Sequence, residues 1–241
     1  MRAVPTIVTV SLNPAIDRVI EVPDFKPGAH QVGREVSRIA GGKAVNVSRV
    51  LAALGVPNIA TGFLGQENRA DFEQILKGPL VKDELFLLPG RTRENVTIAD
   101  PTTGRETHIR DLGLEVPAPA LGRLVSKLKL LCSRRPVVIF GGSRPPGISV
   151  EVFAELVSNC ISAGARVAVD ASGEGLAAMA GKPLWLVKPN ADELAQLVGR
   201  ELPTEQKRFQ AARELAKRNL FIPRYWASLS TFRVPLTLVS S

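Results

Sequence analysis

Residues 40–55 read AGGKAVNVSRVLAALG, and this stretch decides the fold. Two glycines and a lysine stand directly before apolar residues spaced three and four apart, which predicts a helix ending at Gly55. Its apolar face is expected to hold Val45, Val47, Val50, Leu51 and Leu54. Free N–H groups, the helix dipole and the Lys43 ammonium suit the start of this helix to an anion. The stretch is neither a Walker A loop nor a dinucleotide fingerprint, so a plain turn is the alternative.

A strand followed by a helix is a rhythm that repeats on both sides of this stretch. Strands are predicted at 5–11, 58–64, 136–140, 167–170 and 184–187, and helices at about 68–77, 121–131 and 152–161. Such alternation implies an α/β fold with a parallel sheet. The composition agrees, because hydrophobic residues make up 45% of the chain and aromatic residues only 5%, which favours aliphatic sheets covered by helices over a β-sandwich.

Two segments, residues 17–39 and 95–110, break this rhythm. Polar and apolar residues alternate in both, around turn signals, which predicts half-exposed antiparallel strands. Because they interrupt a sheet of buried strands, we expect them to project together as a small β-lid over the C-terminal edge of that sheet.

The net charge and the lengths of the apolar runs indicate which partners the protein binds and where in the cell it lies. The net charge is +8, but +5 of it lies in residues 200–241. The remaining +3 suits a protein with anionic small substrates, and a simply solvated surface is the alternative. Binding of nucleic acid through the basic tail is the weakest alternative. No apolar run approaches the roughly 18 residues that cross a bilayer, and the N-terminus reads as a strand. We therefore expect a cytoplasmic protein without a membrane partner.

The two cysteines, Cys132 and Cys160, fall at apolar positions of predicted helices. Their sequence context has neither the spacing nor the partners of a metal site or a disulfide framework. We interpret both as reduced core thiols.

Polar residues that follow predicted strands are the candidates for chemistry. Asp17 follows the opening strand, where open parallel sheets bind ligands, and its carboxylate could accept hydrogen bonds from sugar hydroxyls; a turn residue after Pro14 is the alternative. Arg91 and Arg93 open the second lid segment. The planar arginine fork suits phosphate, although a basic loop is also commonly just solvated.

The stretch KPNADE, residues 188–193, follows a strand and opens a helix. Asn190 and Glu193 are spaced as the N-cap and third residue of a capping box. The same residues fit a water shell around Mg²⁺ on nucleotide phosphates, with Lys188 or Asn190 on a phosphate. The spacing is compatible with both interpretations.

Six segments in this order resemble the phosphofructokinase B (ribokinase-like) family of carbohydrate kinases, especially its 1-phosphofructokinase and tagatose-6-phosphate kinase branch. They are TVSLNPAID (9–17), GGKAVNVSRVLAALG (41–55), GRTRENV (90–96), GGSRPPG (141–147), VDASGEGL (169–176) and VKPNADEL (187–194). The resemblance covers residues 6 to about 215. It implies a three-layer α/β/α sandwich with a β-lid that often pairs in a homodimer.

The resemblance also implies a reaction and its substrate residues. ATP and Mg²⁺ would phosphorylate a ketohexose phosphate, either fructose 1-phosphate to the 1,6-bisphosphate or tagatose 6-phosphate to its bisphosphate. Lys43 and Arg93 would hold the phosphate already on the sugar, and Ser143 would lie in a loop facing the sugar. The remaining implied sugar-binding residues are Asp17, Gly41, Gly42 and Asn46.

The implied nucleotide side consists of Lys188, Asn190 and Glu193, with Mg²⁺ associated indirectly with Asn190 and Glu193. Arg144 departs from the family, which usually has an apolar residue before Pro-Pro-Gly. This arginine is expected either to alter the loop or to face solvent.

A second departure concerns catalysis. The family places a Gly-Ala-Gly-Asp motif at a helix N-terminus, where its amides stabilise the transferring phosphoryl group and its aspartate deprotonates the attacking hydroxyl. The 241 residues contain no such motif. We therefore assign no catalytic residue, and expect 1–220 to be an incomplete, C-terminally truncated kinase domain with strongly impaired activity.

The last residues, 221–241, read as an atypical tail, whose composition suggests a change of coding frame near Arg218 or Asn219. A peripheral strand and loop is the alternative. For the whole chain, the alternative functions are a non-catalytic sugar-phosphate-binding module and a damaged gene product.

Overall fold

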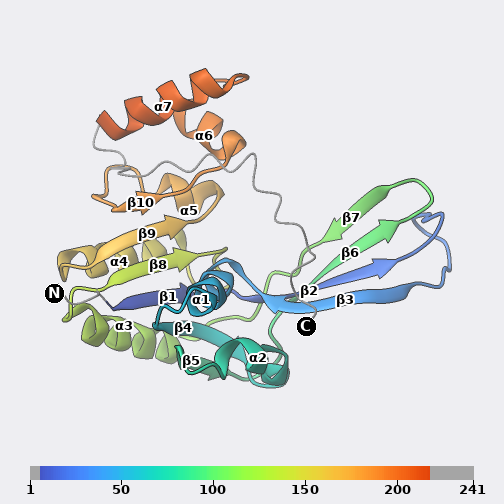
Figure 1. Ribbon diagram of the computed structural model, residues 1–241, viewed down its shortest axis with the longest axis horizontal. Helices are drawn as coiled ribbons and strands as arrows, with labels where there is room; N and C mark the ends of the chain where they lie inside the picture. The colour runs from blue at the N-terminus through green and yellow to red at the C-terminus, as the bar shows by residue number, and fades with distance from the viewer. Residues whose placement is uncertain (1–5, 218–241) are drawn as a thin grey trace.

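A parallel sheet of six strands forms the centre of the computed structural model, which describes residues 6–217 (Figure 1). The strand order is β10-β9-β8-β1-β4-β5. The strands are β1 (Ile7–Ser11), β4 (Asn58–Gly65), β5 (Val81–Leu88), β8 (Val137–Gly141), β9 (Arg166–Asp170) and β10 (Leu186–Val187). All their pairings are parallel, as the strand-then-helix rhythm predicted.

Helices cover both faces of this sheet. They are α1 (Lys43–Ala53), the 3₁₀ helix η1 (Arg69–Phe72), α2 (Glu73–Leu76), α3 (Ala118–Cys132), α4 (Val150–Ser162), α5 (Gly173–Ala177), α6 (Ala191–Val198) and α7 (Glu205–Lys217). Alternate residues of β4 enter two separate cores: Phe63 joins the cluster that contains α3 and α4, whereas Ala60 and Leu64 join the cluster of α1 and α2. Two cores on opposite faces make a three-layer α/β/α sandwich, which confirms the predicted fold class.

Three sequence predictions about the body need correction. The edge strand β5 was not predicted, because the charges in VKDELFLL interrupt its apolar pattern; only an edge position tolerates them. The helix expected at 68–77 begins as a 3₁₀ turn. Val50 and Leu54, placed on the apolar face of α1, are 53% and 73% exposed. Within residues 6–217, α1 contacts the sheet mainly through its N-terminal half, so these two side chains stay uncovered.

A second sheet, with the order β3-β2-β6-β7, projects beyond the carboxyl ends of the central strands (Figure 1). Its strands are β2 (Ala15–Glu21), β3 (Arg34–Gly41), β6 (Glu94–Asp100) and β7 (Arg105–Ile109). The antiparallel prediction is correct for β2–β3 and β6–β7 and wrong for the central β2–β6 pair, which is parallel. Both middle strands leave the body at the same place, where the Ile16 N–H bonds the Arg93 carbonyl, so they run in the same direction.

No helix within residues 6–217 is long and apolar enough to cross a membrane. The predicted tail, 221–241, lies outside the described residues. The division into 1–220 and 221–241 stays a prediction.

Candidate active site

The glycines before α1 bring two chain segments into close contact. Gly42 has φ +115°, and a Cβ built on it would lie 3.0 Å from the Pro14 Cα. A Cβ on Gly41 would lie 3.3 Å from the Asn46 Oδ1. Because only glycine accepts this φ without strain, the helix start can pack directly against the turn that follows β1.

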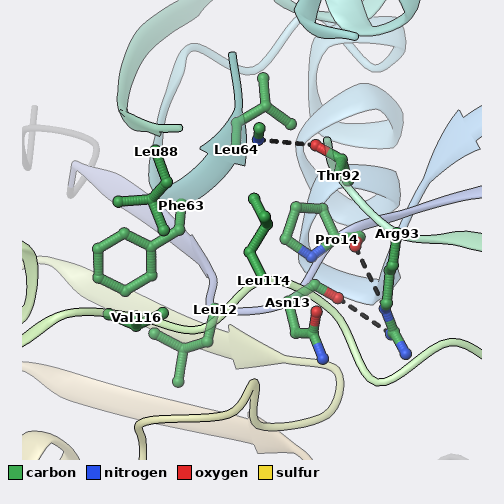
Figure 2. Close-up of a pocket in the computed structure, with 11 residues that line it drawn as sticks. Leu12, Asn13, Pro14, Phe63, Leu64, Leu88, Thr92, Arg93, Leu114 and Val116 are labelled. Carbon is green, nitrogen blue, oxygen red and sulfur yellow. Dashed lines mark hydrogen bonds between the residues drawn. The ribbon is translucent and has the colours of Figure 1, made fainter. Parts of the chain in front are cut away.

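Arg93 is the most heavily bonded side chain of the site. Its Nε donates to the Pro14 carbonyl at 3.3 Å, and its second terminal nitrogen donates to the Asn13 carbonyl at 3.0 Å, as Figure 2 shows. Further bonds of 3.0 Å reach the Asp111 carbonyl and the Ser143 hydroxyl. Burial is the main cause that lowers the pKa of Arg93. The guanidinium thus ties together three loops at the carboxyl edge of the sheet.

Apolar side chains pack to one side of this arginine (Figure 2). Phe63, Leu88, Leu114 and Val116 line a remaining cavity of only about 10 Å³ beside Arg93. That is barely the volume that one water centre needs, so the space is packing and not a substrate pocket. It follows that little free space remains between Arg93 and these side chains.

Asp17 lies on β2 within reach of the second lid segment. The Asn95 side-chain amide donates to its carboxylate at 2.8 Å, and an Arg110 nitrogen lies 4.0 Å from the same oxygen. Asn95 is 6% exposed, and its own Oδ1 is the one buried side-chain acceptor without a partner among the described residues. Buried acceptors are normally bonded, so this oxygen lacks a donor that the described residues do not supply.

Two lysines share the carboxylate of Asp170, the last residue of β9. The Lys43 ammonium is 2.8 Å from the Asp170 Oδ1, and the Lys188 ammonium is 3.8 Å from it. Both lysine side chains remain exposed, at 45% and 38%. Because exposed ion pairs contribute little free energy, an incoming anion can replace the carboxylate as their partner at small cost.

The start of α6 carries the predicted capping box. The Glu193 N–H donates to the Asn190 Oδ1 and the Asn190 N–H donates to the Glu193 Oε2, both at 2.8 Å. The structural interpretation of this spacing is therefore confirmed. The second Glu193 carboxylate oxygen is not part of the box, so a water-mediated metal role is still compatible with it.

Magnesium fits this corner only in a particular way. Residues 6–217 contain no group of three or more His, Cys, Asp or Glu side chains that could hold a metal ion directly. Mg²⁺ usually keeps several waters and binds through one or two carboxylates plus substrate phosphates. The exposed end of α6 with Glu193 suits that mode of binding.

The predicted residues thus fall into two groups. Ser143 and Arg93 meet directly, and Asn13 donates to Ser143 as well, at 3.3 Å. Lys43 instead pairs with Asp170, on the side of Lys188, so the structure does not bring Lys43 and Arg93 onto a common partner.

Sequence reasoning missed four residues of this site: Asn13, Asn95, Arg110 and Asp170. Three of them lie inside the quoted segments, SLNP, GRTRENV and VDAS, where a polar residue at a strand end was the available signal. Arg110 follows β7 in an exposed segment and offered no such signal.

Arg144 does not simply face solvent. It donates to the Ile148 carbonyl at 3.0 Å and lies 3.4 Å from the Glu174 carboxylate, so it links its loop to α5. Together with Ser143 and Ser172 it lines a cavity of about 320 Å³ at the ends of β8 and β9. The departure from the family pattern therefore holds the loop beside the site.

Comparison with known proteins identifies the family. The profile of the pfkB family carbohydrate kinases matches residues 6–222. The chain belongs to the pfkB family. It is 41% identical over 214 residues to 1-phosphofructokinase of Rhodobacter capsulatus, an alignment that covers 87% of this chain and 67% of that protein. The chain is therefore a member of a sugar kinase family whose relatives are longer than it is.

Solved structures agree with the family. The structure of phosphofructokinase-2 from Escherichia coli in complex with fructose-6-phosphate superposes with a TM-score of 0.80 at 27% identity, covering 90% of this pfkB chain and 72% of that one. Ribokinase of Arabidopsis thaliana complexed with ribose and ATP superposes with a TM-score of 0.63 at 19% identity, covering 90% of this chain and 70% of that chain. The latter likeness shows the ribokinase-like fold alone.

Proposed function

We propose that this pfkB chain binds a phosphorylated ketohexose, with fructose 1-phosphate as its first candidate and tagatose 6-phosphate as the alternative. The observation that carries the proposal is the presence of two separate cationic groups at the carboxyl edge of the sheet: Arg93, bonded to Ser143, and the pair Lys43 and Lys188 around Asp170. Ligands of open α/β sheets bind at this edge. Two separated cationic groups match a reaction that brings two phosphate-bearing substrates together.

We propose that the sugar binds between Asp17 and the glycines before α1. The Asp17 carboxylate accepts sugar hydroxyls, and the unpartnered Asn95 Oδ1 accepts a further donor. Gly41 and Gly42 let the helix start pack against Pro14 and Asn46, so their backbone borders the proposed sugar position. These residues orient the ring so that one hydroxyl faces the nucleotide side.

The phosphate of the sugar is held by arginine and lysine in this proposal. Arg93 is already fixed by its four bonds, so it loses little side-chain entropy on meeting an anion. Lys43 reaches the same ligand by leaving Asp170, an exchange between exposed partners.

The nucleotide side is assigned to Lys188, Asn190 and Glu193. ATP, when bound, supplies the phosphoryl group, and Mg²⁺ neutralises charge on its phosphates. The Lys188 ammonium would meet a phosphate, and the half-buried Glu193 carboxylate the water shell of the metal. The capping box holds both Asn190 and Glu193 in one orientation, which prepares them for that task.

Turnover by these 241 residues is proposed to be strongly impaired. The sequence contains no Gly-Ala-Gly-Asp segment, from which the family resemblance draws the general base and the anion-stabilising amides. Loss of general-base catalysis alone commonly costs about 10² to 10⁴ in rate. Turnover equal to that of a longer relative would contradict this part of the proposal and leave substrate binding intact.

Isothermal titration calorimetry tests the binding proposal. The full chain is titrated with fructose 1-phosphate, and with fructose as the control that lacks phosphate. Asp17→Asn is expected to weaken sugar-phosphate binding by about tenfold, the size of a lost charged hydrogen bond. The matched control, Glu106→Gln, changes an exposed carboxylate on β7 and should bind normally. Absence of any heat from the unchanged protein would overturn the proposed function.

Pairing of two chains through the projecting sheet is also proposed. Ile39 and Ile109 leave 47% and 54% of their surface exposed, on opposite faces of that sheet. A partner that covered either face would gain apolar burial. Analytical ultracentrifugation tests this, and a monomer at high concentration would reject it.

A further inference from the structure

Asn68, the residue directly before η1, binds both polar groups of the Thr92 backbone. Its side-chain Nδ2 donates to the Thr92 carbonyl oxygen at 2.9 Å, and the Thr92 N–H donates to the Asn68 Oδ1 at 2.8 Å. Asn68 is only 4% exposed and Thr92 only 3%. The side-chain amide therefore bonds Thr92 as the opposite residue of an antiparallel strand would, with both bonds shielded from water.

Further contacts join the same two segments, the chain that follows β4 and the chain that leads into β6. The Gly65 N–H donates to the Thr92 Oγ1 at 2.8 Å, and the Glu67 N–H donates to the Gly90 carbonyl at 3.1 Å. A Cβ built on Gly65 would lie 2.1 Å from the Thr92 nitrogen, so only glycine allows this approach. The two segments are thus in direct backbone contact, and Asn68 closes the junction between them.

Helix capping does not explain the asparagine at this position. Asn68 is the N-cap residue of η1, where an asparagine side chain commonly accepts a hydrogen bond from a helix N–H. Its side chain makes no such bond, and the Asp71 N–H donates instead to the Asn68 backbone carbonyl at 3.2 Å. Both hydrogen bonds that the Asn68 side chain makes within residues 6–217 go to Thr92. The amide therefore serves the segment across from it and not its own helix.

Arg93 is the residue that follows Thr92 in the chain. Its own carbonyl accepts the Ile16 N–H at 2.9 Å, so its backbone is held by Asn68 on one side and by Ile16 on the other. A side chain as long as arginine turns a small backbone rotation into a large displacement of its guanidinium. Binding groups tolerate only about 0.5 Å or 10° to 20° of misplacement. The bond from the Arg93 guanidinium to Ser143 therefore depends on the junction at Thr92.

We propose that Asn68 is a positioning residue for sugar-phosphate binding, because it fixes the backbone from which Arg93 reaches the phosphate. Asn68 acts through Arg93 and does not contact the ligand itself. This inference rests on the proposed function, in which Arg93 holds the phosphate of the sugar. Loss of any buried hydrogen bond lowers stability. A positioning role predicts in addition that the Arg93 guanidinium moves and that affinity for the sugar phosphate falls.

Asn68→Ala tests the proposal, with Asn58→Ala as the matched control. Asn58 begins β4, whereas Asn68 follows its end; Asn58 is also 4% exposed and its side chain is hydrogen-bonded to Ser48. Both variants should lower the melting temperature of the full chain. Only Asn68→Ala should weaken fructose 1-phosphate binding in calorimetry, by about tenfold, as expected when a partner that orients a binding residue is lost.

The Arg93 side chain reports on the same change without any sugar. Its Nε–H donates to the Pro14 carbonyl, and the signal of this group in proton–nitrogen correlation spectra can be assigned by its loss in Arg93→Lys. Asn68→Ala should shift or broaden this signal, and Asn58→Ala should leave it in place. If Asn68→Ala does not fold, Asn68→Asp keeps the size and the acceptor but loses the donor to Thr92, and the same two changes are expected.

Unchanged affinity of the Asn68 variant for fructose 1-phosphate would overturn the positioning role, and so would an unchanged Arg93 signal. Equal losses of affinity in Asn68→Ala and Asn58→Ala would also reject it, because the loss would then follow from lower stability alone. Absence of heat from the unchanged protein would instead count against the proposed function. The Arg93 signal then decides by itself whether Asn68 positions this arginine.

Discussion

The site has an arginine corner, Arg93 with Ser143, and a lysine corner, Lys43 and Lys188 with Asp170. The two corners differ in how firmly their side chains are held without a ligand. Arg93 is half-buried and makes four hydrogen bonds, three to backbone carbonyls and one to the Ser143 hydroxyl. Lys43 and Lys188 are exposed and share one carboxylate, that of Asp170. The first corner is therefore part of the framework, and the second exchanges partners with solvent and ligands. The positive charge of Arg93 thus helps to hold the loops together, whereas the charges of Lys43 and Lys188 stay accessible to an anion.

Among the changes that test this difference between the corners, removal of the Arg93 side chain should have the largest effect on stability and binding. Arg93→Ala leaves buried carbonyl oxygens without donors, and we expect a loss of about 3 kcal/mol of unfolding free energy together with loss of sugar-phosphate binding. Urea denaturation measures the stability. The control is Arg91→Ala, since Arg91 is 56% exposed and makes one ion pair of 3.3 Å with Glu94. Equal stability of both variants would show that Arg93 is not a framework residue.

A Glu94 variant tests whether the ion pairs at the base of the projecting sheet also stabilise the fold. Its carboxylate pairs with Arg18 and Arg38, and the hydrogen bond from Arg38 is the main cause that lowers its pKa to about 2. A depressed carboxyl pKa gives stability above the unfolded pKa, which is lost as the pH falls through the folded value. We expect Glu94→Gln to cost about 1 to 2 kcal/mol at pH 7.

That difference should shrink between about pH 4.5 and pH 2, because the native carboxylate is then protonated as well. Denaturation curves across this pH range measure it. A difference that stays constant down to pH 2 would mean that the Glu94 charge does not stabilise the fold.

An Arg110 variant tests whether the site extends to the segment that follows β7. It lies 4.0 Å from the Asp17 carboxylate, and its charge contributes to the lowered pKa of Arg93. We expect Arg110→Gln to weaken fructose 1-phosphate binding by about threefold to tenfold, as for a lost exposed charge contact. The matched control is Arg105→Gln, at the first residue of β7, the strand that Arg110 follows. Equal affinity of the two variants in calorimetry would place Arg110 outside the site.

Asp170 should show the smallest change in stability. Asp170→Asn removes the partner that the two exposed lysines share, and we expect the unfolding free energy to change by less than about 1 kcal/mol. Binding of ATP without Mg²⁺ should tighten by a few-fold, because no carboxylate then competes for Lys43 and Lys188. A large loss of stability would show that the lysine corner also holds the fold together.

Local sequence patterns predicted much of the fold because they report local physics. The apolar spacing located most helices, and the Asn190 to Glu193 spacing gave a capping box that the structure contains. The pattern failed where neighbours outside the segment decide the outcome. An edge position permitted the charged strand β5, and a shared point of departure made β2 and β6 parallel.

The sequence alone determined the family segments, the strand-then-helix order and the glycines on which the turn before α1 depends, since each follows from residues near one another in the chain. Only the tertiary structure decided the partners: Asp170 for Lys43, and Ser143 for Arg93. The physical reason is that such pairs join residues from separate elements. Their distance depends on how the layers pack, and no local spacing records it.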